Sequence, residues 1–316
     1  MSPSLNKVLA RLWPDPRARL GVALMRQSVC AVRVHASAAG SHGVDWIRHQ
    51  DLPFRLFEGI PPPDAVHRLT GAFSELCAAA RNSYLPVHIA LADPAVSLRV
   101  FELDDVPKSR IARARLAQWL LEKELGLRDV TCVHQYLGKQ DQRHLLLASA
   151  VDRRWFTVVR DAWRAAGIVP HLVDAAISLM VDRFYVQLAR AEGATGLVTL
   201  EPESWTLALL DGQKRLRYVR SRWRKDSSKE NSSDHEEIVD EVERTIVAFS
   251  HGVSQRNIKT VYLTGAATDL AGFSAALDAR MQTPSIALAV DSGFRRGALD
   301  EENIPSAAAL AGAMSR

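Results

Sequence analysis

The sequence contains few cysteines and no long apolar run, and both absences narrow the class of protein. Its cysteines, Cys30, Cys77 and Cys132, lie far apart in a chain of 316 residues. Their odd number and wide spacing fit neither a disulfide framework nor a zinc or redox motif, so we expect a reducing cytoplasmic setting. No run of about 18 apolar residues occurs, which predicts that no helix spans a membrane. The first residues also lack the apolar core and cleavage site of a secretory signal.

Familiar catalytic motifs are absent as well. The ten histidines are scattered without the spacing of a metal hydrolase. The chain contains no Walker loop and no Gly-x-Ser-x-Gly elbow. Asp104 and Asp105 shortly precede Pro107, and we interpret them as the start of a helix rather than as an acid–base pair. These absences argue against an enzyme and predict no metal ligand set.

The charge balance is only mildly basic, at +4 with a pI near 9.1, which does not by itself indicate nucleic-acid binding. One stretch is strongly basic: residues 214–225 hold seven Lys/Arg among twelve residues. Such a stretch can contact anionic lipid or nucleic acid. It can also be a solvated hairpin strand, and the acidic residues that follow it favour this second interpretation. We therefore expect no nucleic-acid partner.

The N-terminal segment, residues 1–17, also has two interpretations. Residues 4–13 place apolar side chains at helical spacing with Lys7 and Arg11 between them. A short basic amphipathic helix of this kind can lie on a membrane surface. It can equally pack on its own domain or fray, because a helix of three turns is marginal alone.

Two parts of the chain have the same predicted order of elements, three strands, a helix and a strand. In the first part, the strand pattern covers 18–25, 28–37 and 43–52, the helix covers 62–82, and the last strand covers 87–93. In the second part, the strands cover 195–202, 204–212 and 213–221, the helix covers 234–252, and the last strand covers 258–265. This repetition predicts a duplicated α/β fold with a cleft between two halves.

A different unit separates the two halves. Its predicted elements are a strand at 97–103, a helix at 106–126, strands at 129–138 and 143–151, and a helix at 152–167. We therefore predict an α+β insertion over residues 95–170, after a first half at 18–94. A single long helix over 171–193 is predicted to begin the second half, 171–316. That half is expected to include a polar linker at 225–235 and a C-terminal helix.

These elements, with several quoted stretches, resemble the actin-like ATPases. Within them the sequence is most similar to the type IV pilus assembly protein PilM family and to the related MshI proteins of MSHA pilus biogenesis, and more distantly to FtsA. The stretches are "LGVALMRQSVCAVRV", "LDDVPKSRIARARLAQWLLEKELG", "AWRAAGIVPHLVDAAISLM", "VYLTGAATDLAGFSAAL" and "ENIPSAAALAGAMSR". The resemblance covers residues 18 to 316 and implies duplicated actin-like (ribonuclease H-like) halves with a small α+β insertion.

The chain departs from the family pattern at the positions that would hold ATP. Where the family has Asp-Ile-Gly in its two phosphate turns and two glycines in its adenosine turn, this chain has Gly21, Ala23, Met25, Thr199, Glu201, Gly265 and Ala266. The family also carries a further subdomain after its second hairpin, and here that interval is only the polar stretch 221–237. The resemblance therefore implies a degenerate nucleotide site at these seven positions.

Each substitution has a physical cost for nucleotide binding. Magnesium prefers carboxylate and phosphate oxygens, and Ala23 offers none. Met25 and Glu201 put side chains where a glycine lets phosphate approach the backbone, and Glu201 adds a negative charge. Losing two or three charge-assisted hydrogen bonds at roughly 1.5–3 kcal/mol each would remove about 3–9 kcal/mol, whereas a micromolar ligand binds with about 8 kcal/mol. We predict a pseudo-ATPase without cofactor.

The resemblance implies a function without catalysis. We expect a cytoplasmic scaffold, peripheral at the inner membrane, that binds the cytoplasmic tail of a PilN-like single-span protein. An extended peptide is expected in a groove between residues 18–93 and 95–170, by strand addition to a sheet edge. The alternative is an actin-like assembly protein that binds ATP with magnesium at an active site. An enzyme of the wider sugar-kinase and chaperone superfamily is a further alternative. Two further kinds of partner stay open, a membrane surface and a second copy of this chain.

Overall fold

The computed structural model describes most of the chain. The described residues are 18–36, 42–78, 85–126, 128–140, 142–224, 232–250, 257–265, 267–281, 283–288 and 307–314. The predicted N-terminal segment 1–17, the position Ala266 and residues 225–231 of the predicted linker lie outside them.

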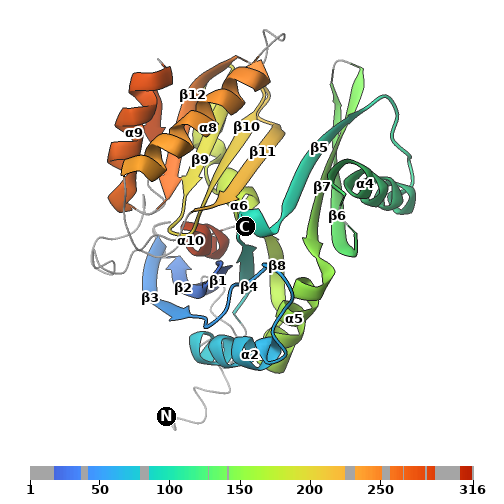
Figure 1. The fold of residues 1–316 in the computed structure, drawn as a ribbon, viewed down its shortest axis with the longest axis vertical. Coiled ribbons are helices and arrows are strands. Elements are labelled where there is room, and N and C mark those ends of the chain that lie inside the picture. The colour runs from blue at the N-terminus through green and yellow to red at the C-terminus, as the bar shows by residue number, and fades with distance from the viewer. Residues whose placement is uncertain are drawn as a thin grey trace.

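The first half is built on a mixed five-stranded sheet (Figure 1). Its elements are β1 (Ala18–Leu24), β2 (Ser28–Ala36), β3 (His42–Asp51), α2 (Ala65–Leu76) and β4 (Val87–Leu91), followed by a short 3-10 turn, η1 (Asp93–Ala95). The predicted order of three strands, a helix and a strand is confirmed. The strand order is β3-β2-β1-β4-β8, with β1 antiparallel to β2 and parallel to β4.

The fifth strand of this sheet corrects a sequence prediction. Residues 171–193, predicted as one long helix, form the strand β8 (Pro170–Ala175) and two short helices, α6 (Ala176–Arg183) and α7 (Tyr185–Arg190). Strand β8 pairs in parallel with β4. Its few residues have no strong periodicity of their own, so pairing with an open sheet edge decides their conformation.

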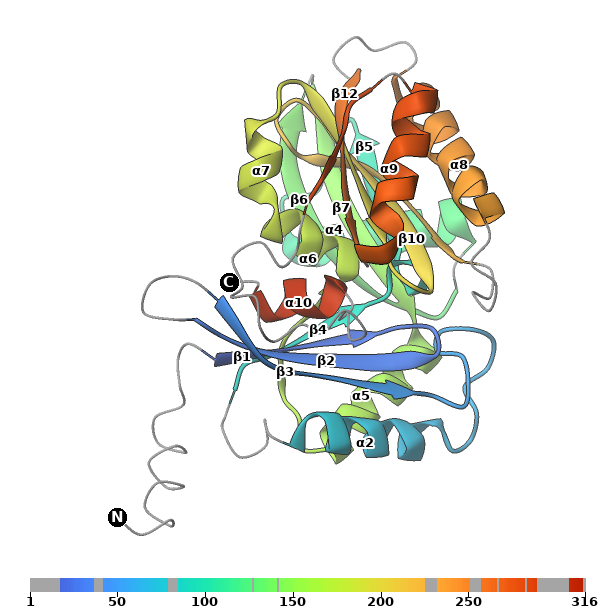
Figure 2. The ribbon, with the colours of Figure 1, turned by 90° about the vertical axis from the view of Figure 1, so that its left-hand side faces the viewer.

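Helix α5 (Arg153–Ala165) also lies elsewhere than predicted. Residues 152–167 were assigned to the insertion, but α5 packs beside α2 beneath the first sheet (Figures 1 and 2). Its residues Trp155, Val159 and Trp163 are buried in the core of the first half. The chain therefore returns to the first half at Asp152, before the predicted boundary at 170.

The second half repeats the arrangement. Its elements are β9 (Ala194–Leu200), β10 (Ser204–Leu210), β11 (Leu216–Trp223), α8 (Ser232–Ser250), β12 (Ile258–Gly265), α9 (Ala267–Met281) and β13 (Ser285–Ala287). The strand order is β11-β10-β9-β12-β13, and α8 and α9 lie on one face of the sheet (Figure 1). Helix α8 begins at Ser232, inside the predicted linker 225–235, which is therefore shorter than expected.

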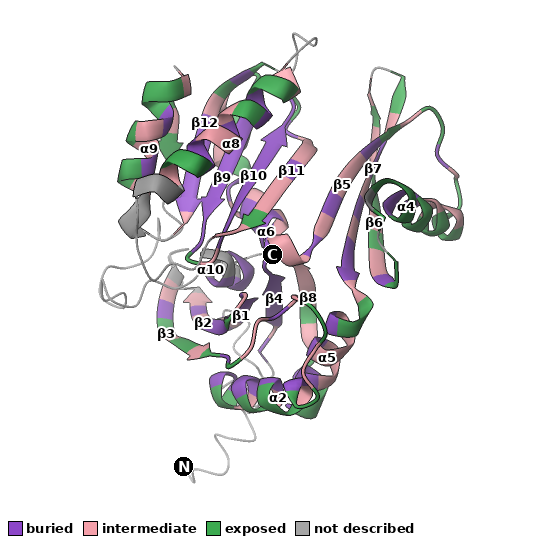
Figure 3. Cartoon of the chain, in the orientation of Figure 1, coloured by how far each residue is buried: buried purple, intermediate pink, exposed green. Residues whose placement is uncertain are grey.

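The insertion is a small sheet with one helix. Strands β5 (Ser97–Leu103), β6 (Val130–Gln140) and β7 (Arg143–Asp152) pair in the order β5-β7-β6. Helix α4 (Arg110–Leu125) packs on this sheet, and Phe101, Leu121 and Leu146 are among its buried core residues. Much of α4 remains exposed, in contrast to the largely buried sheets of the two halves (Figure 3).

The predicted C-terminal helix is confirmed and occupies a central position. Helix α10 (Ala307–Met314) lies between the two halves, on strand β1 (Figure 2). Its residues Ala309, Ala311 and Ala313 are fully buried. They belong to one apolar cluster that also contains Met25 from the first half and Leu210 from the second, so the core continues across the junction. Among the described residues, no helix is both long and apolar enough to cross a membrane.

Candidate functional site

The structure places the predicted nucleotide positions at the junction of the halves. Gly21 and Ala23 lie in β1, and Met25 follows its end. In the second half, Thr199 lies in β9, and Glu201 follows that strand. Gly265 ends β12, where it pairs with Leu200. The side chains of Ala23, Met25, Thr199 and Glu201 are all buried, with 1–5% exposure. The junction is therefore closed by protein at these positions.

Both described glycines of the set have a structural explanation. A Cβ on Gly21 would lie 1.9 Å from the carbonyl oxygen of Ala309, so this glycine allows α10 to rest on β1. A Cβ on Gly265 would lie 1.9 Å from the carbonyl oxygen of Leu200, and Gly265 has φ +147°. That backbone conformation is rare for residues with a side chain. Neither glycine needs a nucleotide to account for its presence.

A carboxylate that the sequence analysis did not single out joins the two halves. Glu203 lies in the β9–β10 turn (residues 201–203) and reaches the β1–β2 turn (residues 25–27). One of its oxygens accepts hydrogen bonds from the backbone N–H of Arg26 at 2.6 Å and of Gln27 at 3.1 Å. The other oxygen lies 3.2 Å from the same N of Gln27. Burial raises the pKa of Glu203 above its usual value, and these backbone hydrogen bonds offset only part of that rise.

The side chain of Arg26 makes a second connection at the same place. Its Nε donates to Glu58 at 2.5 Å within the first half. Its Nη1 donates to the carbonyl oxygen of Arg224 at 3.4 Å in the second half, and its guanidinium lies 5.8 Å from the ring centre of Trp223. The backbone N–H of Arg224 in turn donates to the carbonyl oxygen of Glu203 at 2.8 Å. The Glu203 carboxylate of the second half thus contacts the first half, and the Arg26 guanidinium of the first half contacts the second.

These residues do not fit a magnesium nucleotide. The N–H groups of the β1–β2 turn, which could bind phosphate oxygens, already donate to the Glu203 carboxylate. Ala23 supplies no oxygen for a cation, and Glu201, at another of the predicted positions, is a buried carboxylate. A carboxylate at this turn would repel a polyphosphate. Within the described residues, no cluster of three His, Cys, Asp or Glu side chains could hold a metal ion.

A buried acid lies where the first half meets the second, and the sequence analysis missed it as well. Asp93 begins η1 directly after β4, is 5% exposed, and accepts a hydrogen bond at 2.8 Å from the N–H of Ile177 in α6. Burial raises the pKa of Asp93 to about 7, against hydrogen bonds from Ile177 and from Thr206 in β10. Its position directly after a buried strand is the sequence feature that could have identified Asp93 as a candidate.

A groove lies between the insertion sheet on one side and β8 with α6 on the other, and Leu216 of β11 also lines it. The sequence predicted a groove between residues 18–93 and 95–170, but none of the described lining residues lies in 18–93. Its volume is about 460 Å³. The lining is mostly apolar, with Leu98, Val133, Leu137, Leu147, Leu172, Leu179, Val181 and Leu216. Among the described lining residues, the acids are Asp174 and Asp182, and none is a Lys or Arg. Burial raises the pKa of Asp174, and burial together with nearby arginines lowers the pKa of His134. We call this feature the insertion groove.

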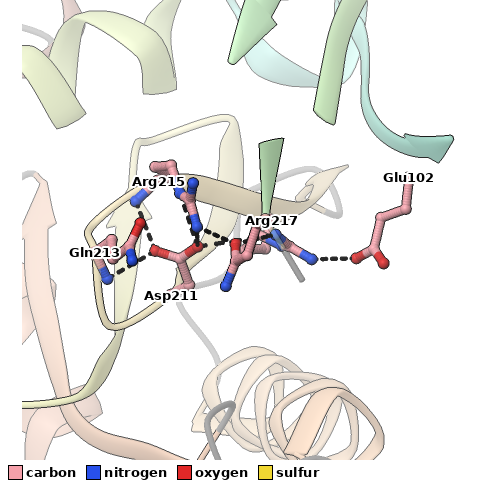
Figure 4. A network of polar contacts seen from close by, with 6 residues as sticks. Glu102, Asp211, Gln213, Arg215 and Arg217 are labelled. Carbon is pink, nitrogen blue, oxygen red and sulfur yellow. Dashed lines mark hydrogen bonds and ion pairs between the residues drawn. The ribbon is translucent and has the colours of Figure 1, made fainter. Parts of the chain in front are cut away.

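The basic stretch 214–225 is mostly engaged within the chain. Arg217, with its side chain only 6% exposed, forms ion pairs with Glu102 of the insertion and with Asp211, the latter at 3.8 Å (Figure 4). Arg215 also pairs with Asp211. Further along the strand, Arg220 forms an ion pair with Glu241 of α8. The predicted solvated strand is therefore partly buried, and its arginines connect β11 to the insertion and to α8.

Comparison with known proteins identifies the fold. No protein-family model and no curated protein sequence matches this chain. Among solved structures, a PilM–PilN type IV pilus biogenesis complex superposes with a TM-score of 0.70 and 17% identity, covering 94% of this chain and 97% of the other. The chain has an actin-like ATPase fold. A Bacteroides thetaiotaomicron VPI-5482 protein, described as having that fold and an unknown function, gives a TM-score of 0.57 and 9% identity over 89% and 93% of the two chains.

The predicted fold class is thus confirmed. The overlap with the matched chain of the PilM–PilN complex includes nearly all of both chains. At 17% identity the similarity shows the fold and not the activity or the partner.

Proposed function

We propose that this protein is a non-catalytic scaffold of a type IV pilus assembly machine, PilM-like or MshI-like. In this proposal it works at the cytoplasmic face of the inner membrane and binds the cytoplasmic tail of a PilN-like protein in the insertion groove. The observation that carries the proposal is the groove itself, in a fold that superposes over nearly its full length on a PilM–PilN complex.

The architecture of the insertion groove suits an extended peptide. Strand β8 ends the first sheet and β6 ends the insertion sheet, so each has one described strand neighbour. Both contribute lining residues, among them Leu172 from β8 and Val133 from β6. A sheet edge can receive a peptide by backbone hydrogen bonds, while apolar pockets select its side chains.

The charges of the groove favour a particular tail. Asp174 and Asp182 lie in the groove lining, and no lysine or arginine is found among the lining residues that the structure describes. A tail with apolar residues and at least one basic side chain, or a free amino terminus, complements this lining.

The junction of the halves supports the absence of catalysis. An ATPase of this fold needs oxygen ligands for magnesium and free backbone donors for phosphate. This chain has Ala23 at one such position and the Glu203 carboxylate on the donors. The alternative of an active ATP site would require Glu203 to leave the β1–β2 turn.

Binding of a labelled peptide tests the proposal. A peptide of the cytoplasmic tail of a PilN-like protein from the same organism should bind the wild-type chain, measured by fluorescence anisotropy. Val181→Arg, in the groove lining, should weaken binding at least about tenfold by filling apolar space with charge. Val169→Arg is the matched control, because Val169 is 85% exposed and does not line the groove.

The outcomes separate the groove from the scaffold. The groove would be refuted as the site by either of two results: the two variants lose binding equally, or neither variant loses binding. No binding to the wild-type chain would refute the proposed partner. The groove can also be tested by deleting the insertion and measuring peptide binding. That deletion should end at Asp152, because α5 with its buried Trp155 and Trp163 belongs to the first half.

A further inference from the structure

The β1–β2 turn presents successive backbone donors toward one acceptor. The N–H groups of Arg26 and Gln27 both point at the Glu203 carboxylate, with N–O distances of 2.6 and 3.1 Å. Successive backbone N–H groups that converge in a turn form a nest, a general binding site for anions. Here the anion is part of the same chain and comes from the other half.

We propose that Glu203 is an internal anion ligand of the β1–β2 turn, which it occupies in place of a free phosphate, and that it joins the two halves without nucleotide. This inference does not depend on the partner of the insertion groove. It assigns to one side chain the role that a bound anion would otherwise have at this turn.

The surroundings of Glu203 support a fixed ligand rather than a chance surface contact. The residue is half-buried, so its charge is partly removed from water and needs compensation. Its backbone oxygen accepts from the N–H of Arg224, which holds the β9–β10 turn against β11. Charge-assisted hydrogen bonds from backbone N–H groups to a carboxylate are among the stronger ones in proteins.

Arg26 holds the turn from the opposite direction. Its guanidinium donates to Glu58 at 2.5 Å in the first half and to the Arg224 carbonyl oxygen at 3.4 Å in the second. The turn is therefore fixed at the point where Glu203 binds it. A fixed turn keeps its N–H groups converged, which is what an anion site requires.

Gln27 provides a sharp test because the residue itself is exposed. An exposed turn amide normally exchanges its hydrogen quickly, whereas one bound to Glu203 should be protected. We would measure hydrogen exchange at Arg26 and Gln27 by NMR in the wild-type chain, Glu203→Gln, Glu203→Ala and the control Glu192→Gln, an exposed acid in the same half. Amides of β9 and β12 serve as the internal reference for global unfolding.

The wild-type chain and the control should show protected amides at both positions. Glu203→Ala should raise their exchange about ten- to a hundredfold, and Glu203→Gln should raise it less, while the reference amides stay unchanged. Adding millimolar inorganic phosphate to Glu203→Ala should restore protection, because a free anion then fills the turn.

Three results would overturn the inference. They are fast exchange of Gln27 in the wild-type chain, equal exchange in wild type and Glu203→Gln, and no effect of phosphate on Glu203→Ala while its reference amides remain protected. The first result is measured on the wild-type chain alone. It can therefore refute the inference even if a variant does not fold.

Discussion

The carbonyl oxygen of Ala309 lies 1.9 Å from the point where a Cβ on Gly21 would stand. The glycine thus allows the C-terminal helix α10 to seat against β1, with Ala309, Ala311 and Ala313 fully buried. A residue that the family resemblance connected with nucleotide is explained by contact between two parts of the chain that are far apart in sequence.

Gly21→Ala should therefore destabilise the fold. The added methyl meets backbone atoms, which cannot rotate away, so α10 must shift, at a cost of about 1–3 kcal/mol. The measurement is the free energy of unfolding in urea. Gly71→Ala in α2 is the control, because no atom lies within 4 Å of its added Cβ, and it should gain about 0.5–1 kcal/mol. Equal effects of the two changes would contradict the contact.

Gly265→Ala distinguishes a structural glycine from a nucleotide glycine. Its φ of +147° and the Leu200 carbonyl oxygen at 1.9 Å predict strain in the β9–β12 pairing, at a cost of about 1–3 kcal/mol without ligand. The thermal midpoint should fall clearly, while Gly272→Ala in α9, with open space around its Cβ, should not lower it. A Gly265→Ala variant as stable as wild type would refute the structural explanation.

Asp93 should make stability depend on pH. Burial raises its folded-state pKa from 3.8 to about 7, so between those values the folded state keeps a proton that the unfolded state has released. The free energy of unfolding should then fall as pH rises from about 4 to 7, and level off above. A shift of this size corresponds to a few kcal/mol, on the order of 1.4 per pKa unit.

The comparison with Asp93→Asn isolates this effect. The variant lacks the titration, so its stability relative to wild type should increase from pH 5 to pH 7.5. Urea unfolding at the two pH values supplies the measurement. A constant difference between the two proteins would show that Asp93 has an ordinary pKa.

Arg217→Met should loosen the insertion from the second half. Arg217 is 6% exposed and pairs with Glu102 of β5, so its removal leaves that contact unmade, at a cost of about 1–3 kcal/mol. Hydrogen exchange should increase mainly in β5. Arg222→Met is the matched control, because Arg222 is 60% exposed in its pair with Glu241 and should contribute at most about 1 kcal/mol.

Wild-type protein should show no thermal shift with millimolar ATP and magnesium. A ligand at about 100 times its dissociation constant would add about 2.7 kcal/mol to the free energy of unfolding, which is readily detected. A clear and saturable shift would contradict the pseudo-ATPase proposal and favour the alternative of an active nucleotide site.

Much of the fold follows from the sequence. Local patterns were strong where one face of a strand or helix is apolar, so the repeated strands, the insertion and the C-terminal helix could be predicted. The seven candidate positions came from the resemblance, and the six that the structure describes lie at the junction of the halves.

Other features were decided only by the tertiary structure. Strand β8 forms because β4 offers an unpaired edge, and α5 joins the first half because Trp155 and Trp163 find their apolar partners there. Glu203 could not be recognised from its neighbours in sequence, since its hydrogen-bond donors lie 176 and 177 residues away. A local pattern encodes which face of an element is apolar, but which distant groups meet depends on the packing of the whole chain.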